Sequence, residues 1–188
     1  PTLSSAASDV YKRQDLGYRL KFGKSNELKW GPFAGLPEQR ADDIHEMFAN
    51  SDIDAIFCAR GGYGANRVLP LLDYNLIKGN PKIFIGYSDI TAMLTSITQK
   101  TSLITFHGPM LTSYKDSWVE YNYSLMQRVL SGEKFIKIYS PDGLETKILK
   151  HGIAHGPLWG GNMCLLINRL GTNESLNTDG VILFCLLY

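Results

Sequence analysis

One short stretch of the sequence places a potentially nucleophilic side chain at a turn. Ser88 lies in IGYSDIT (85–91), between the apolar run KIFIGY and a segment typical of a helix. A serine at a strained strand-to-helix turn can act as a nucleophile, with the backbone N–H of Asp89 as one oxyanion donor. A serine at such a junction can equally be a helix N-cap. Because residue 90 is Ile, G-x-S-x-G is incomplete and spacing alone leaves both interpretations open.

A second stretch, RGGYG (60–64), follows another apolar run, DAIFCAR. Its glycines could present backbone N–H groups to a substrate or a phosphate. The sequence evidence for a phosphate-binding loop is weak, because this stretch lacks both the G-x-G-x-x-G spacing and the P-loop lysine. The structural alternative is a tight turn that needs positive φ.

Histidines and cysteines give weaker signals. His107, in FHGPM, is either a structural residue or a general base or substrate contact. His151 and His155 have i, i+4 spacing, but adjacent glycines argue against a helix and therefore against a metal site there. The three cysteines show no CxxC spacing, which favours reduced thiols in a cytoplasmic protein.

Apolar periodicity indicates the elements that must position these turns. Strands are expected at 18–23, 54–60, 82–87, 102–108 and 179–184, and helices at about 38–50, 65–72, 89–100 and 116–131. DYNLIKGNP (73–81) is expected to form a helical turn that Gly79 and Pro81 stop. Alternating strands and helices favour a parallel α/β sheet with its sites at the carboxyl ends of the strands. After residue 132, FIKIY and ETKILKHGIA indicate a β-rich section, and GPLWGGNMCLLINRLGT a glycine turn followed by a short helix.

Composition excludes some partners. The chain of 188 residues has a formal net charge of +1, so it has no electrostatic footprint for nucleic acid or an anionic membrane. No apolar run is long enough to span a bilayer.

Both ends of the sequence differ from the rest. PTLSSAASDVYKRQ (1–14) resembles a translated transposase sequencing adapter, and one coding of VYKRQ has a reverse complement that encodes CLLY, the last four residues. We therefore expect residues 1–14 and 185–188 to be adapter-derived, and the authentic part to be 15–184.

Taken together, the motifs resemble one known family. RGGYGANRVLPLLDYNLIKGNPKIFIGYSDITAM, LITFHGPM, GPLWGGNMCLLINRLGT and DGVILF occur in the order found in the LD-carboxypeptidases, which are serine peptidases. The family includes muramoyltetrapeptide carboxypeptidases and microcin-immunity hydrolases. The resemblance implies a flavodoxin-like N-terminal catalytic-serine domain (15–132) without its first strand, and the beginning of a β-rich C-terminal domain (133–184).

The same resemblance implies roles at both turns. Ser88 becomes the nucleophile rather than a cap, and the backbone N–H groups of Asp89 and of either Gly61 or Gly62 become the oxyanion donors. Arg60, Tyr63 and His107 are candidate substrate contacts, although Arg60 could instead support the turn through an ion pair.

The family's catalytic base is a Glu–His pair from the C-terminal domain. Leu186 stands where the glutamate is expected, and the histidine would lie beyond Tyr188. We therefore expect this chain to be a fragment with little or no activity.

The implied reaction is removal of the terminal D-alanine from peptidoglycan tetrapeptides during cytoplasmic cell-wall recycling, with a muropeptide substrate and no metal or organic cofactor. Two alternatives remain open: hydrolysis of toxic aminoacyl-nucleotide analogues on the same serine, and a non-catalytic binding fragment. The resemblance also allows a homodimer of the intact parent, with no nucleic-acid or membrane partner.

Overall fold

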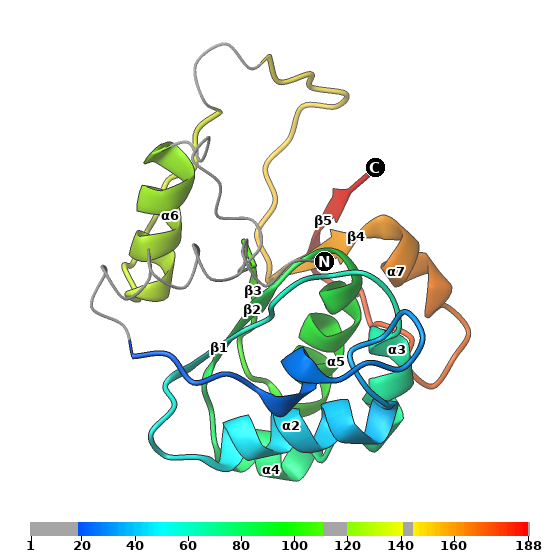
Figure 1. Ribbon diagram of the computed structural model, residues 1–188. Helices are drawn as coiled ribbons and strands as arrows, with labels where there is room; N and C mark the ends of the chain where they lie inside the picture. Colours follow the sequence, from blue (N-terminus) through cyan, green and yellow to red (C-terminus); the bar gives the residue numbers. More distant parts are fainter. Residues whose placement is uncertain (1–18, 111–119, 141–144, 188) are drawn as a thin grey trace.

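The computed structural model describes residues 19–110, 120–140 and 145–187, in which parallel strands alternate with helices (Figure 1). The strands are β1 (Ala55–Phe57), β2 (Ile83–Gly86), β3 (Phe106–His107), β4 (Leu158–Asn162) and β5 (Ile182–Leu186). The α-helices are α2 (Pro37–Ala49), α3 (Ala65–Val68), α4 (Tyr74–Gly79), α5 (Thr91–Thr101), α6 (Glu120–Leu130) and α7 (Met163–Asn168). Short 3₁₀ turns form at η1 (Lys24–Glu27), η2 (Leu69–Leu71) and η3 (Ser88–Ile90). The predicted α/β class with parallel strands is confirmed.

The strands form two parallel sheets. β2 lies between β1 and β3, with Ala55 opposite Ile83 and Gly86 opposite His107. β4 pairs with β5 in a separate two-stranded sheet. Figure 1 shows α2, α4 and α5 beside the first sheet, and α6 apart from this group. The expected helix at 116–131 is described only from Glu120, because its start lies outside the described residues.

The core of the first sheet forms where apolar periodicity predicted it. Phe48 of α2 and Phe84 of β2 are almost completely buried, and their rings stack with centroids 5.9 Å apart. Ile77 of α4 and Ile97 of α5 are also fully buried. Each such side chain contributes about 1.5–3 kcal/mol by leaving water, so these contacts hold the helices against the sheet.

Helix α5 is buried on both of its faces. The predicted apolar face, which includes Met93 and Ile97, packs into the core as expected. The opposite, polar face is buried as well, because Thr95 is 5% exposed and Ser96 is fully covered. The chain after β4 supplies this cover.

Arg169 is the main contact on the polar face of α5. Its side chain is almost completely buried and donates hydrogen bonds to Ala92 O (3.2 Å), Thr95 Oγ1 and Ser96 Oγ (2.7 Å). Glu174, 3.4 Å from Arg169 Nη2, also accepts a hydrogen bond from Ser96. Burial lowers the pKa of Arg169, while the nearby Glu174 carboxylate opposes this effect.

Strand β4 also contacts the start of α5. The backbone N–H of Asn162 donates to Thr91 Oγ1 at 3.0 Å. A Cβ on Gly161 would lie 2.6 Å from the Thr91 side chain, and one on Gly160 would lie 1.7 Å from the carbonyl oxygen of Phe184 in β5. The prediction of a glycine turn here is therefore wrong. Both residues lie within strand β4. They are glycines because neighbouring groups approach too closely for a side chain.

The strand predicted at 18–23 is absent from its described part, 19–23. This segment runs beside α2 and leads into η1, where the Asp43 carboxylate accepts the backbone N–H of Lys24 at 3.0 Å. The Lys24 ammonium also pairs with Glu46 at 2.7 Å. Contacts with a helix therefore replace the pairing that a strand would need.

The β section predicted between residue 133 and β4 is also wrong for the described residues 133–140 and 145–157, which contain no strand. Alternating apolar side chains there remain in solvent, with Leu149 88% and Ile153 92% exposed. A strand needs a hydrogen-bonded neighbour, and no described strand pairs with these two segments. The short helix predicted after the glycines is confirmed as α7.

We expect Arg169→Ala to destabilise the protein by about 2–4 kcal/mol, because it leaves buried polar groups on α5 without their partner. The matched control is Arg128→Ala, which removes an exposed ion pair with Glu133 and should have a much smaller effect, because water and salt screen exposed ion pairs. Urea unfolding of both variants measures the difference. Equal losses would contradict the structural role of Arg169.

Candidate active site

Ser88 lies where β2 turns into α5, and its backbone is in the left-handed region with φ of 60°. This conformation is strained for a residue with a side chain and is often found at functional turns. The helix-cap interpretation does not describe this residue, because Tyr87 and Ile90 hold the N-cap positions of η3 and α5. The local geometry is that of a strand–turn–helix elbow.

The elbow needs a glycine two residues before the serine. A Cβ on Gly86 would lie 2.7 Å from the Ile90 side chain and 3.3 Å from Cys58 Cβ. Cys58 follows β1, and its N–H donates to Ile85 O at 3.0 Å. Burial raises the pKa of the Cys58 thiol to about 12. This cysteine is therefore a poor nucleophile, although it lies close to Gly86 of the elbow.

The glycine turn 60–64 lies against the elbow. A Cβ on Gly61 would be 3.0 Å from Ser88 Cβ, 3.3 Å from Ser88 Oγ and 3.5 Å from Met110 Cε. Gly62 has φ of 117° and nothing within 4 Å of the corresponding position. Gly61 is therefore the glycine that packs on the Ser88 side chain, and Met110, which is buried, lies close to the same glycine.

A side chain that follows the elbow joins the two turns by accepting a hydrogen bond from the backbone. The buried Asp89 carboxylate accepts the backbone N–H of Ala65, the first residue of α3, at 2.9 Å. Arg40 of α2 donates from Nη1 to Gly64 O at 3.2 Å. Burial raises the pKa of Asp89, while the Ala65 N–H and the Arg40 charge act in the opposite direction.

His107 lies on the neighbouring strand, opposite Gly86. Its ring meets Tyr87 edge-on with centroids 6.2 Å apart. The residue keeps exposed surface, but its ring is partly enclosed, and this burial lowers the pKa of His107. His107 is thus beside the elbow, and its role in substrate contact stays a prediction.

The other two candidate contacts lie in the glycine turn and face solvent. Tyr63 is 83% exposed. Arg60 is exposed as well, and within the described part of the chain it forms no ion pair. Both side chains are free to meet a substrate, and both assignments stay predictions.

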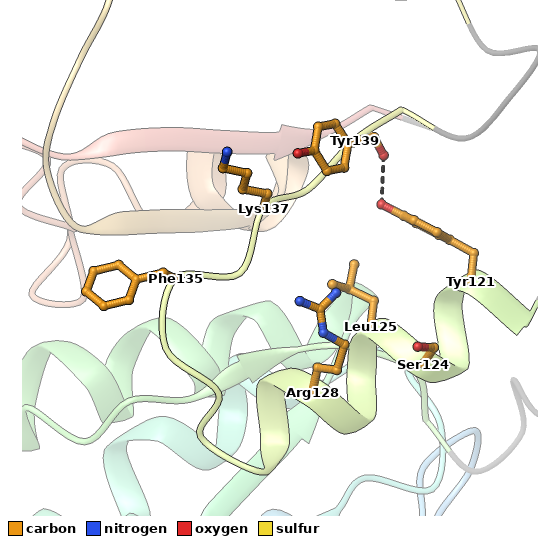
Figure 2. Close-up of a pocket in the computed structure, with 7 residues that line it drawn as sticks. All are labelled: Tyr121, Ser124, Leu125, Arg128, Phe135, Lys137 and Tyr139. Atoms are coloured by element: carbon orange, nitrogen blue, oxygen red, sulfur yellow. Dashed lines mark hydrogen bonds between the residues drawn. The ribbon is translucent and has the colours of Figure 1, made fainter.

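A separate shallow hollow of about 390 Å³ lies between α6 and the chain after it (Figure 2). It is lined by Tyr121, Ser124, Leu125, Arg128, Phe135, Lys137 and Tyr139. Figure 2 shows the hydrogen bond from Tyr121 Oη to Tyr139 O, which is 2.7 Å long. None of these lining residues belongs to the two turns, so the hollow is distinct from the Ser88 elbow.

Residues 19–110, 120–140 and 145–187 contain neither a cluster of metal-binding side chains nor a membrane-spanning helix. No group of three or more His, Cys, Asp or Glu side chains is arranged to hold a metal ion. No described helix combines the length and apolarity needed to cross a bilayer.

Sequence reasoning missed three side chains around the elbow: Arg40, Met110 and Thr91. Met110 belongs to the FHGPM stretch, three residues after His107. Its closeness to this candidate residue was the feature of the sequence that could have indicated it. Thr91 lies in the marked IGYSDIT stretch, but its partner Asn162 is far away in the sequence. Arg40 lies on a different helix, and no local pattern connects it to the glycine turn.

Comparisons with known proteins agree with this architecture. Residues 4–108 match the model of the LD-carboxypeptidase N-terminal domain. The probable murein peptide carboxypeptidase of Bacillus subtilis (strain 168) is 38% identical over 173 residues, which cover 91% of this chain and 54% of the relative. The murein tetrapeptide carboxypeptidase of Pseudomonas aeruginosa is 31% identical over 168 residues, covering 86% and 54%. The chain thus spans about half the length of these curated relatives.

Solved structures show the same similarity. The crystal structure of an MccF-like protein from Bacillus anthracis superposes with a TM-score of 0.88 at 31% identity, covering 98% of this chain and 62% of that protein. The microcin C7 self-immunity protein MccF in its apo state gives 0.82 at 30% identity, covering 96% and 62%. Fold and sequence thus place the chain among α/β proteins of a carboxypeptidase class. It belongs to the LD-carboxypeptidase family.

We expect Gly61→Ala to lower the reactivity of Ser88 about tenfold or more, because the added methyl group would displace the proposed nucleophile. The measurement uses a hybrid in which this chain through Phe184 is followed by the C-terminal part of the Bacillus subtilis relative. The rate of Ser88 modification by an alkyl fluorophosphonate is followed in this hybrid by mass spectrometry. Gly79→Ala in α4 is the control, since nothing lies within 4 Å of its added methyl group. An unchanged rate in Gly61→Ala would contradict the close packing of this glycine on Ser88.

A pH-dependent stability difference is expected for Asp89→Asn, which keeps an acceptor for Ala65 but removes the charge. Because the pKa of Asp89 is raised on folding, its favourable contribution is complete below the ordinary aspartate pKa and is lost as pH rises through the raised value. The free energy of unfolding of Asp89→Asn should therefore increase relative to wild type as the pH rises above the ordinary aspartate pKa of about 4. Urea unfolding across this range is the measurement, and a constant difference would contradict the raised pKa.

Proposed function

We propose that this chain carries the nucleophile and the oxyanion donors of a serine carboxypeptidase that removes the terminal D-alanine from peptidoglycan tetrapeptides. The observation that supports this proposal most directly is Ser88 in a positive-φ elbow, packed against Gly61 of the glycine turn. Membership of the LD-carboxypeptidase family supports the reaction class. The relatives named as murein peptide carboxypeptidases support the substrate class.

The proposed reaction begins when Ser88 Oγ attacks the carbonyl carbon of the peptide bond that precedes the terminal D-alanine. The backbone N–H of Asp89 and one N–H of the glycine turn would stabilise the negative charge that develops on the carbonyl oxygen. A histidine oriented by a glutamate would accept the serine proton and return it to the leaving amine. The family resemblance assigns that pair to the C-terminal part of the whole protein, so overall activity is proposed for the whole protein.

Substrate binding requires recognition of a terminal carboxylate. Arg60 is the proposed cationic contact because its exposed side chain belongs to the turn that contacts Ser88. His107 and Tyr63 flank the same region and are proposed as further contacts. The proposed chemistry uses protein groups alone. A cytoplasmic location and a homodimer remain predictions that go with this function.

A second function has specific support. The microcin C7 self-immunity protein of Escherichia coli is 45% identical to this chain over 98 residues. One solved structure of that protein contains aspartyl sulfamoyl adenosine and superposes on this chain with a TM-score of 0.81. The alternative substrate is therefore an aminoacyl-nucleotide analogue, hydrolysed by the same serine. A non-catalytic binding role is the third outcome to be tested.

The experiment uses a hybrid in which this chain through Phe184 is joined in frame to the remaining C-terminal part of the Bacillus subtilis relative. Tetrapeptide and aspartyl sulfamoyl adenosine are supplied separately, and released D-alanine or aspartate is quantified. We expect D-alanine release by the hybrid and a loss of at least about 10³-fold in its Ser88→Ala variant. The unjoined chain is the reference, with much lower turnover expected.

Each alternative predicts a different result. Release of aspartate without D-alanine would favour the nucleotide-analogue function. Substrate binding by a folded hybrid without turnover would favour a binding role. Equal turnover in the Ser88→Ala hybrid would contradict the assignment of the nucleophile.

A further inference from the structure

The side chain of Asp89 connects the two turns of the candidate site. Asp89 follows Ser88 directly, and the residue is only 6% exposed. The carboxylate accepts a hydrogen bond of 2.9 Å from the backbone N–H of Ala65, the residue immediately after the glycine turn. One side chain thus spans from the serine elbow to the far end of the turn that packs on Ser88.

Arg40 reinforces this connection from α2. Its guanidinium donates to Gly64 O at 3.2 Å, on the residue that precedes Ala65. Its positive charge also acts on the Asp89 carboxylate and favours the ionised form. The carboxylate therefore has a backbone donor and a nearby cation, and the Gly64–Ala65 peptide at the end of the glycine turn is held at both its N–H and its C=O.

The glycine turn has a particular need for such contacts. Gly62 and Gly64 adopt φ of 117° and 94°, values that glycine reaches readily along with many others. A turn built from such residues loses its shape easily unless neighbouring groups hold it. Oxyanion stabilisation depends on donors that are fixed before the reaction begins, so a mobile turn would weaken the site even with Ser88 in place.

We propose that the Asp89 carboxylate, assisted by Arg40, is the positioning group that holds the glycine turn 60–64 against Ser88. Asp89 then has two separate roles, because its backbone N–H faces the oxyanion while its side chain fixes the second donor. The catalytic meaning of this inference rests on the proposed function, whereas the ordering of the turn does not depend on it.

The competing explanation is that Asp89 is only a helix cap that adds stability. The chain contains a matched control for this explanation. Asp73 caps α4, where its carboxylate accepts the N–H groups of Asn75 and Leu76, both at 2.9 Å. Asp73→Ala therefore removes the same kind of cap from a helix outside the two turns.

The experiment compares the full chain with Asp89→Ala, Asp89→Asn and Asp73→Ala. Backbone ¹⁵N order parameters of residues 61–65 are measured for each protein, together with the urea midpoint. The rate of Ser88 modification by an alkyl fluorophosphonate is measured in parallel on the hybrid that carries the same substitutions. In that reaction Ser88 Oγ bonds to phosphorus, fluoride leaves, and the hydroxyl proton passes to solvent.

We expect the order parameters of the turn to fall from about 0.85 to below about 0.6 in Asp89→Ala. Asp89→Asn should restore them, because its amide oxygen still accepts from Ala65. Asp73→Ala should lower the urea midpoint without changing the turn. Where wild-type Ser88 reacts, its modification rate should drop about tenfold or more in Asp89→Ala and recover in Asp89→Asn.

An ordered turn in Asp89→Ala, or equal disorder in Asp73→Ala, would overturn the inference. The proposed function fails separately: fluorophosphonate incorporation by the hybrid that is the same with Ser88 and with Ser88→Ala would contradict the nucleophile. In that case the order parameters still decide whether Asp89 positions the turn.

Discussion

The burial of α5 on both faces is the constraint on which the rest of this structure depends. Its apolar face packs on β2 and the neighbouring helices, while its polar face meets Arg169 and strand β4. A helix held from both sides cannot rotate to relieve strain at its first turn. The unusual backbone of Ser88 is therefore maintained by contacts made along the whole helix.

The parallel pairing of the strands explains why two turns that are distant in the sequence lie together. β1 and β2 are adjacent and parallel, so the residues that follow them emerge at one edge of the sheet. The Gly61 turn leaves β1, the Ser88 elbow leaves β2, and His107 ends β3 on the other side. The strand register brings the residues together, and Asp89 adds a bond between the two connections.

Much of this arrangement could be predicted from sequence, because it follows local periodicity. The apolar spacing around Phe48 and Ile97 indicated two helices correctly, and the runs before Gly61 and Ser88 indicated two buried strands. Alternating residues between 133 and 157 were misleading, since the pattern of a strand does not supply its pairing partner. Arg40 and Arg169 could not be found in this way, because burial of a charged residue depends on partners from other elements.

The left-handed backbone of Ser88 has a consequence for how this sequence can change. A residue with a side chain costs about 1–2 kcal/mol in this conformation, and glycine at the same position would avoid that cost. Selection for thermal stability alone would therefore remove the hydroxyl group at position 88. Retaining serine there is a stability–activity trade-off, located at the residue to which the proposed chemistry assigns the attack.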